Sequence, residues 1–108
     1  MKVQVNTGHN IEGHEAFVAH VEATVAKTLS HFSAHITRVE VHVADENAGK
    51  YGKNDKKCIM EARLEGRQPI AVTCEAATSG QAVAGAADKL KNALESTMGR
   101  LREHREHR

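Results

Sequence analysis

Apolar and polar residues alternate in four short stretches of the chain, and such alternation predicts β-strands with one apolar and one polar face. The stretches are KVQVNT, ITRVEVHVA, KCIMEARLE and PIAVTCEA, at residues 2–7, 36–44, 57–65 and 69–76. In the second stretch Arg38, Glu40 and His42 alternate with valines. Each predicted strand therefore has one side for a core and one side for water.

Two other stretches carry apolar residues at helical spacing. The first predicted helix covers residues 14–31, and its apolar stripe consists of Phe17, Val21, Val25 and Leu29. The second helix begins after Thr78, because Thr78 and Gln81 have the spacing of a capping box. Its buried stripe consists of Leu90, Leu94, Met98 and Leu101.

The predicted order of elements is β-α-β-β-β-α, which defines an α+β fold. The first strand, first helix and second strand should form a right-handed crossover between parallel strands. The last three strands should form an antiparallel meander. Because each strand has one apolar face, both helices are expected on the same side of a four-stranded mixed sheet. Pro69, at the start of the last strand, is typical of an edge strand.

Residues 66–68 are predicted to form the hairpin turn between the last two strands. If this turn pairs Leu64 with Ile70, Met60 faces Cys74 and Cys58 lies diagonally from Cys74. Both thiols then point inward and act as small apolar side chains. A redox pair is the less favoured alternative.

With 108 residues the chain has the length of one small domain. We assign residues 1–103 to this domain and residues 104–108 to a frayed basic and histidine-containing tail. The formal net charge is only +1, but residues 1–49 hold three basic and six acidic residues, whereas residues 50–108 hold twelve and eight. This asymmetry suggests a polyanionic partner. With one Tyr, two Phe and no Trp, base stacking cannot be the main means of contact.

The sequence carries no signal for a membrane protein, a secreted protein or an enzyme. No stretch approaches the roughly 20 apolar residues of a membrane span, and the N-terminus has no signal-peptide core. Two cysteines do not make a disulfide framework, and no nucleophile–base pair or phosphate-binding loop is recognisable. We therefore expect a cytoplasmic protein with no enzymatic activity, no cofactor and no small-molecule substrate.

The eight histidines raise the question of a metal site. His31 and His35 are four residues apart, but the first helix is expected to end between them. His104 and His107 are three residues apart in the tail. A zinc site needs about four convergent ligands, and no third or fourth ligand is evident. We therefore expect no bound metal.

Basic residues flank the buried stripe of the last helix. On a helical wheel Lys89 and Arg100 fall on one flank, and Lys91 and Arg102 fall on the other. Such residues often cover the edge of a core with their stems while their charged ends reach water. The alternative is a cationic groove between the two helices. The opposite edge of that groove would consist of His20, Lys27 and His31.

A polar loop between the second and third strands is also basic. Its lysines are Lys50, Lys53, Lys56 and Lys57. A solvated loop is the simpler interpretation, and a basic finger that reaches phosphates is the alternative.

The order of these features resembles the ribosome hibernation-promoting factors and ribosome-associated inhibitors, also called protein Y or sigma-factor modulation proteins. The resemblance covers nearly the whole chain and resides in NIEGHEAF, AKTLSHF, ITRVEVHV and EAATSGQAVAGAADKL. The most specific piece is DKL at residues 88–90, followed by a basic helix. The resemblance implies a fold similar to double-stranded-RNA-binding domains.

Members of the family bind the small ribosomal subunit in the channel for mRNA and tRNA, and they inhibit translation or promote ribosome hibernation under stress or in stationary phase. The resemblance thus implies ribosomal RNA and ribosomal proteins as partners of a monomer. The RNA contacts that it implies are Lys27, Lys89, Lys91, Arg100, Arg102 and Arg105. Additional candidate contacts are His20, His31 and the four lysines of the basic loop.

One alternative from another class remains open. The chain can be a regulatory protein-interaction module on the same fold that no longer binds ribosomes. A ribosome-binding factor needs its basic side chains on one continuous surface, whereas an interaction module does not. Histidines near this surface, with an ordinary pKa of about 6.5, also predict tighter RNA binding at mildly acidic pH.

Overall fold

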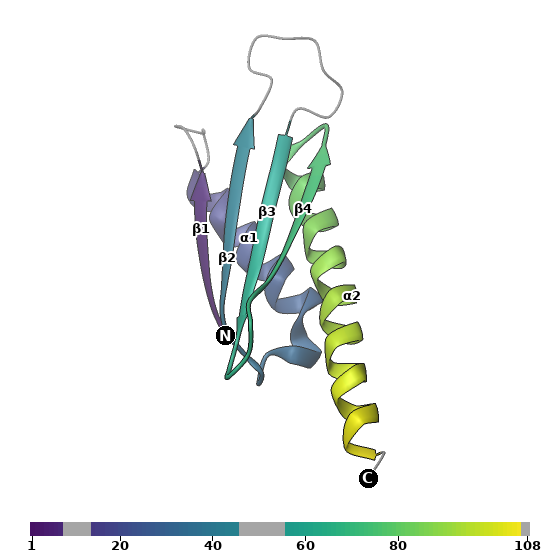
Figure 1. The fold of residues 1–108 in the computed structure, drawn as a ribbon. Coiled ribbons are helices and arrows are strands. Elements are labelled where there is room, and N and C mark those ends of the chain that lie inside the picture. Colours follow the sequence, from purple (N-terminus) through teal and green to yellow (C-terminus); the bar gives the residue numbers. More distant parts are fainter. Residues whose placement is uncertain (8–13, 46–55, 107–108) are drawn as a thin grey trace.

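The computed structural model has the predicted order of elements (Figure 1). It describes the backbone of residues 1–7, 14–45 and 56–106, and the side chains of residues 1–7, 15–44 and 56–99. The elements are β1 (Lys2–Thr7), α1 (His14–Thr28), the 3-10 helix η1 (Ser30–Phe32), β2 (Ile36–Asp45), β3 (Lys56–Leu64), β4 (Ile70–Ala76) and α2 (Ser79–Glu106).

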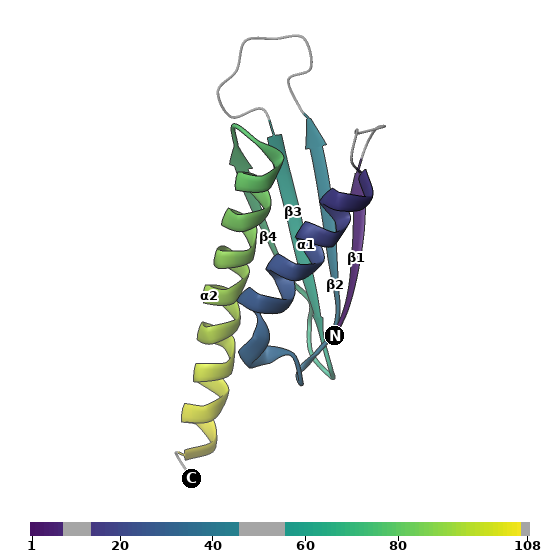
Figure 2. The same cartoon turned by 180° about the vertical axis from the view of Figure 1, so that it is seen from behind.

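The strands form one mixed sheet in the order β1-β2-β3-β4. β1 pairs with β2 in parallel, whereas β2, β3 and β4 pair antiparallel. Both helices cover the same face of the sheet and leave the other face open (Figure 2). The predicted α+β architecture is therefore confirmed, and β4, which follows Pro69, is an edge strand as expected.

The core lies between the sheet and the two helices. Val39 and Val41 of β2 are fully buried, as are Leu90 and Leu94 of α2. The stripe of α1 is buried from Val21 through Leu29, and Phe17 is partly buried against it. Each fully buried aliphatic side chain of this size contributes about 1.5–3 kcal/mol relative to an exposed one. The helical and strand periodicities of the sequence therefore correctly identify the apolar face of each element.

The first helix ends earlier than predicted. α1 stops at Thr28 instead of residue 31, and η1 follows it. In this turn the Phe32 amide donates a hydrogen bond to the Leu29 carbonyl at 2.9 Å. This three-residue spacing tightens the end of the helix. The helical segment still ends between His31 and His35, because η1 stops at Phe32.

The register of the last hairpin differs from the predicted one by two residues. Cys58 lies directly opposite Cys74, and Ala62 lies opposite Ile70. Leu64 is instead paired with the first residue of β2. Pro69 has no amide hydrogen to donate, so the β3–β4 ladder begins only after it. The connection includes Gly66 with a φ of +70°, a conformation that favours glycine.

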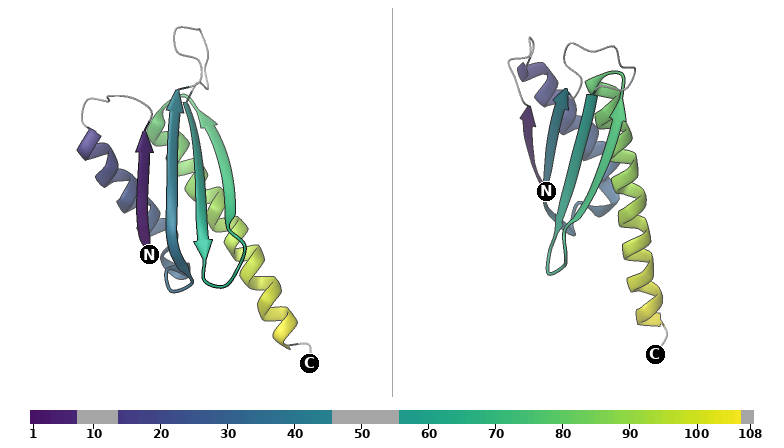
Figure 3. Two further views of the ribbon diagram at one scale, coloured as in Figure 1. Left: turned by 60° about the vertical axis from the view of Figure 1, so that its left-hand side comes forward. Right: turned by 45° about the horizontal axis from the view of Figure 1, so that its top comes forward.

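The second helix begins at the predicted cap. The Gln81 amide donates a hydrogen bond of 3.1 Å to the Thr78 hydroxyl oxygen, which is the contact expected of an N-cap residue. α2 runs to Glu106 and extends past the end of the sheet (Figure 3). It thus crosses the domain boundary assigned at residue 103. Across the described ranges, neither helix has the length and apolar character that a membrane crossing requires.

Candidate nucleic-acid interface

The single lysine of α1 lies at the C-terminal end of the helix. Lys27 occupies the last turn of α1, and His20, Lys27 and His31 of η1 are all exposed. A cation in the last turn interacts favourably with the partial negative charge of the helix C-terminus. The same end of α1 approaches the middle of α2 (Figure 2). The structure thus places Lys27 on the surface of the helix layer.

The two lysines of α2 that the structure describes have different environments. Lys89 is exposed, and its Nζ donates a hydrogen bond of 2.8 Å to the carbonyl oxygen of Thr73 on the edge strand β4. This contact places Lys89 on the flank of α2 that faces away from α1. Two residues later, at 100° per residue, Lys91 lies on the flank toward α1 and is half-buried.

The predicted groove between the helices therefore cannot include both Lys89 and Lys91, because the two lysines lie on opposite flanks of α2. Lys27 is exposed on α1 and Lys91 lies on the flank of α2 opposite to Lys89, whereas Lys89 binds the edge strand of the sheet. An amine bound to an edge carbonyl blocks that carbonyl from another strand. In the sequence, the position of Lys89 on the opposite helical flank from Lys91 is the one indication that Lys89 contacts the edge strand. Nothing in the sequence identifies Thr73 as its partner.

Five further predicted contacts lie wholly or partly outside the described residues. Lys50 and Lys53 are not among the described residues. The backbone of Arg100, Arg102 and Arg105 belongs to α2, but their side chains lie outside the described part.

Lys56 and Lys57 are described, and the expected position of Lys56 in the loop is wrong, whereas Lys57 lies in the strand that the sequence predicts from residue 57. β3 begins at Lys56, and Lys57 pairs with Ala44 on one side and Glu75 on the other. Both lysines are half-buried. The strand therefore begins one residue earlier than the sequence predicted.

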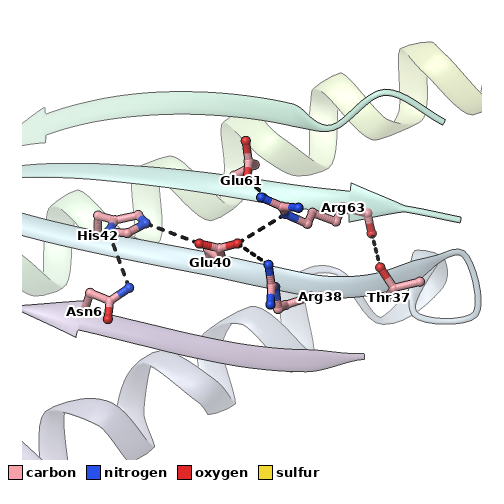
Figure 4. Close-up of polar contacts among 7 residues, drawn as sticks. All are labelled: Asn6, Thr37, Arg38, Glu40, His42, Glu61 and Arg63. Carbon is pink, nitrogen blue, oxygen red and sulfur yellow. Dashed lines mark hydrogen bonds and ion pairs between the residues drawn. The ribbon is translucent and has the colours of Figure 1, made fainter.

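The open face of the sheet carries a network of ion pairs centred on Glu40 (Figure 4). The carboxylate of Glu40 accepts a contact of 2.7 Å from Arg38 Nη2 and one of 3.2 Å from Arg63 Nε. Arg63 Nε also lies 3.4 Å from Glu61. His42 Nε2 lies 3.7 Å from the other Glu40 oxygen, and Asn6 lies 3.5 Å from the His42 ring.

A β-bulge aligns this network. The register of β2 against β3 shifts between Ile36 and Arg38, and the intervening Thr37 donates a hydrogen bond of 3.0 Å to the Arg63 carbonyl. The shift allows Ile36 to be buried while Arg38 faces outward. It also places Arg38 directly opposite Arg63. The sequence predicted the open face but not this juxtaposition.

The two cysteines lie side by side under α2 as free thiols. Burial, and secondarily the neighbouring Cys74, raises the pKa of Cys58 to about 12. A thiol with such a pKa is protonated and a poor nucleophile at neutral pH. Cys74 packs against Gly85 of α2, where an added Cβ would overlap the Cys74 Sγ. These contacts agree with the expected packing role.

Two further features bear on chemistry. In the part of the chain that the structure describes, no three His, Cys, Asp or Glu side chains converge as metal ligands. A shallow hollow lies between the β3–β4 turn and α2, and its lining includes Arg67, Pro69 and Thr97. No carboxylate or imidazole belongs to this lining.

The fold places the chain among small α+β domains with two helices on one side of an otherwise open sheet. The family model described as sigma 54 modulation protein / S30EA ribosomal protein matches residues 4–102, and the chain belongs to this family. A search among curated proteins finds no match.

Solved structures show the same fold. The Thermus thermophilus protein Y N-terminal domain is 21% identical, with a TM-score of 0.69 over 90% of this chain and 99% of that one. A ribosomal subunit interface protein from Coxiella burnetii is 17% identical, with a TM-score of 0.72 over 92% and 99%. At these identities the likeness concerns the fold.

Proposed function

We propose that this protein binds the small ribosomal subunit in the channel for mRNA and tRNA and thereby inhibits translation or promotes hibernation of idle ribosomes. The family match over residues 4–102 carries this proposal. The name of the Coxiella burnetii structure, a ribosomal subunit interface protein, agrees with it. Binding to ribosomes places the protein in the cytoplasm, and the proposal assigns it no catalysis.

The basic residues on the helix layer support the proposal at the level of side chains. Lys27 is exposed on α1 and Lys91 is half-buried on α2, and phosphates that bind such cations release counterions. Arg100, Arg102 and Arg105 continue the sequence of α2 beyond Lys91. We propose all five as ribosomal RNA contacts. For Lys89 the bond to Thr73 supports a structural role instead.

Co-sedimentation with small subunits and with whole ribosomes in sucrose gradients, over a range of salt concentrations, tests this function. We expect association that weakens as salt rises. The variant Lys27→Gln with Lys91→Gln should lose two phosphate contacts, which lowers the salt slope by roughly 1.4 at about 0.7 per phosphate. The matched control is Asn92→Gln, an exposed and uncharged position next to Lys91, and it should bind like the parent.

The outcomes separate the two candidate functions. Absence of salt-sensitive co-sedimentation would sink the ribosome proposal and favour the protein-interaction module. An unchanged salt slope in the double lysine variant would exclude Lys27 and Lys91 from the contact surface. Translation of a reporter mRNA in a ribosome extract measures the inhibitory step separately, and a bound protein that leaves translation unchanged would contradict inhibition.

A further inference from the structure

Three basic side chains form a row across the open face of the sheet. Lys2 of β1 lies opposite Arg38 of β2, and Arg38 lies opposite Arg63 of β3. All three point away from the helices, because the alternate residues of these strands form the core. Neighbouring strands are about 4.8 Å apart, so the row spans roughly 10 Å. Like charges directly opposite one another destabilise a sheet, so this row is unfavourable unless nearby groups or a ligand neutralise it.

Glu40 holds the two arginines of the row in place. It is 17% exposed, and one of its oxygens contacts Arg38 Nη2 and Arg63 Nε at once. Both guanidinium groups thus have one side fixed by a carboxylate. Fixing charged groups in advance reduces the conformational entropy that binding would otherwise cost.

The arginines keep donors that the described residues do not use. A guanidinium has five N–H groups. The ion pairs of Arg63 with Glu40 and Glu61 are made by its Nε, and no hydrogen bond of its terminal nitrogens is found among the described residues. The side chains of Arg38 and Arg63 are 36% and 48% exposed. Arg38 Nε is buried without a hydrogen-bond partner. The network therefore satisfies the arginines only in part.

We infer that Arg38 and Arg63, held by Glu40 and flanked by Lys2, form a second anion-binding site that takes a phosphodiester group of RNA. The free edges of arginine match the two unesterified oxygens of a phosphate. Gln4 and Asn6 are exposed beside the row on β1, and their amides supply hydrogen bonds for ribose and base edges. We name Lys2, Arg38 and Arg63 the sheet-face site.

This site rests on the proposed function for the identity of its ligand, and it adds a second contact to it. The helix surface and the sheet-face site lie on opposite sides of the molecule (Figures 2 and 4). A chain with a net charge of only +1 gains little from its overall field, so local clusters must supply the attraction. Contacts on both sides hold the protein between two RNA segments.

Titration with single-stranded oligouridylate of about 12 nucleotides, a length within the usual site sizes, tests the inference by NMR. The readouts are the Nε–Hε signals of Arg38 and Arg63 and the backbone amides of β2, β3, α1 and α2. We expect the arginine signals and the amides of β2 and β3 to shift together. Shifts confined to the helices would overturn the sheet-face site and leave the proposed function standing. Shifts confined to the sheet would support the sheet-face site and contradict the proposed RNA contacts on the helices.

Two variants separate a shaped site from diffuse charge. Arg38→Lys with Arg63→Lys keeps the charge but loses the planar fork, and we expect about fivefold weaker RNA binding with an unchanged salt slope. Arg38→Gln with Arg63→Gln should also lower the salt slope by roughly 0.7, because the site takes one phosphodiester group. Equal binding of the lysine variant and the parent would overturn the site. Thermal melting of each variant confirms that it is folded.

Polyglutamate of similar length identifies the ligand class. A phosphate site should respond to the oligouridylate at lower concentration than to polyglutamate under the same salt. An equal or stronger response to polyglutamate would overturn the RNA assignment and identify the site as a contact for an acidic protein segment.

Discussion

Gly85 shows how a single residue decides how close α2 lies to the sheet. A Cβ at this position would overlap the Sγ of Cys74, whereas one at Gly99 of the same helix would meet nothing within 4 Å. Gly85 thus permits the close approach of α2 to β4. In a helix glycine is otherwise unfavourable relative to alanine, so its presence here has a packing reason.

We predict that Gly85→Ala lowers the free energy of unfolding by about 1–3 kcal/mol, as overpacking does. Urea denaturation followed by circular dichroism measures the change. Gly99→Ala is the matched control and should raise stability by about 0.5–1 kcal/mol. Adding Cys74→Ala to Gly85→Ala should restore part of the loss, since the two sites share one contact. A purely additive double variant would contradict the proposed overlap.

The raised pKa of Cys58 leads us to expect that the protein becomes less stable at alkaline pH. Its pKa is about 12 in the folded protein against an ordinary value of 9.0. The folded state therefore keeps a proton that the unfolded chain loses, so stability is full below about pH 9 and falls as pH rises toward 12. Urea denaturation between pH 8 and roughly 10.5 measures this slope. Cys58→Ala should be less stable at neutral pH but flatter above pH 9, and equal slopes would refute the assignment.

At the scale of elements, the edge of the sheet at β4 depends on a neighbouring helix. The Lys89 amine binds the Thr73 carbonyl, and Pro69 precedes the strand. Lys91, two residues later, has the opposite orientation. The two lysines are the same residue type two positions apart, yet the packing of α2 beside β4 directs only Lys89 to the edge strand.

We predict different effects for the two lysines. Lys89→Met should lower the free energy of unfolding by about 0.5–1 kcal/mol, toward the lower end for a hydrogen bond because the amine is exposed. It should leave ribosome association almost unchanged. Lys91→Met should weaken ribosome association and leave the free energy of unfolding almost unchanged. Thermal denaturation and co-sedimentation on the same preparations measure both. A larger loss of ribosome binding for Lys89→Met than for Lys91→Met would contradict this division.

At the scale of the whole molecule, one core joins all the elements. Buried residues from both helices and from β2 and β3 form a single cluster, with β1 and β4 packed against it. Small domains with one core usually unfold without stable intermediates.

We therefore expect a single cooperative transition. In calorimetry the measured enthalpy of unfolding should equal the van't Hoff enthalpy. A separate low-temperature transition of helical signal would show that part of α2 unfolds independently of the core.

The likeness to double-stranded-RNA-binding domains stays a prediction, as do the RNA contacts and the role of the histidines. The predicted strands, the cap at Thr78 and the face that each element buries are confirmed. The hairpin register, the end of α1 and the loop position of Lys56 were wrong. All three errors concern where an element begins, ends or pairs, which depends on turn geometry more than on apolar spacing.

The sequence by itself determined the order of elements and the sides of the sheet, because period-two and helical repeats encode which face becomes buried. Only the tertiary structure decided which side chains meet across the sheet and between layers. Arg38 and Arg63 are far apart in the chain, and a bulge sets their alignment. The bond of Lys89 to Thr73 likewise depends on how α2 packs against the edge strand. Contacts of this kind arise from register and packing, which local spacing does not specify.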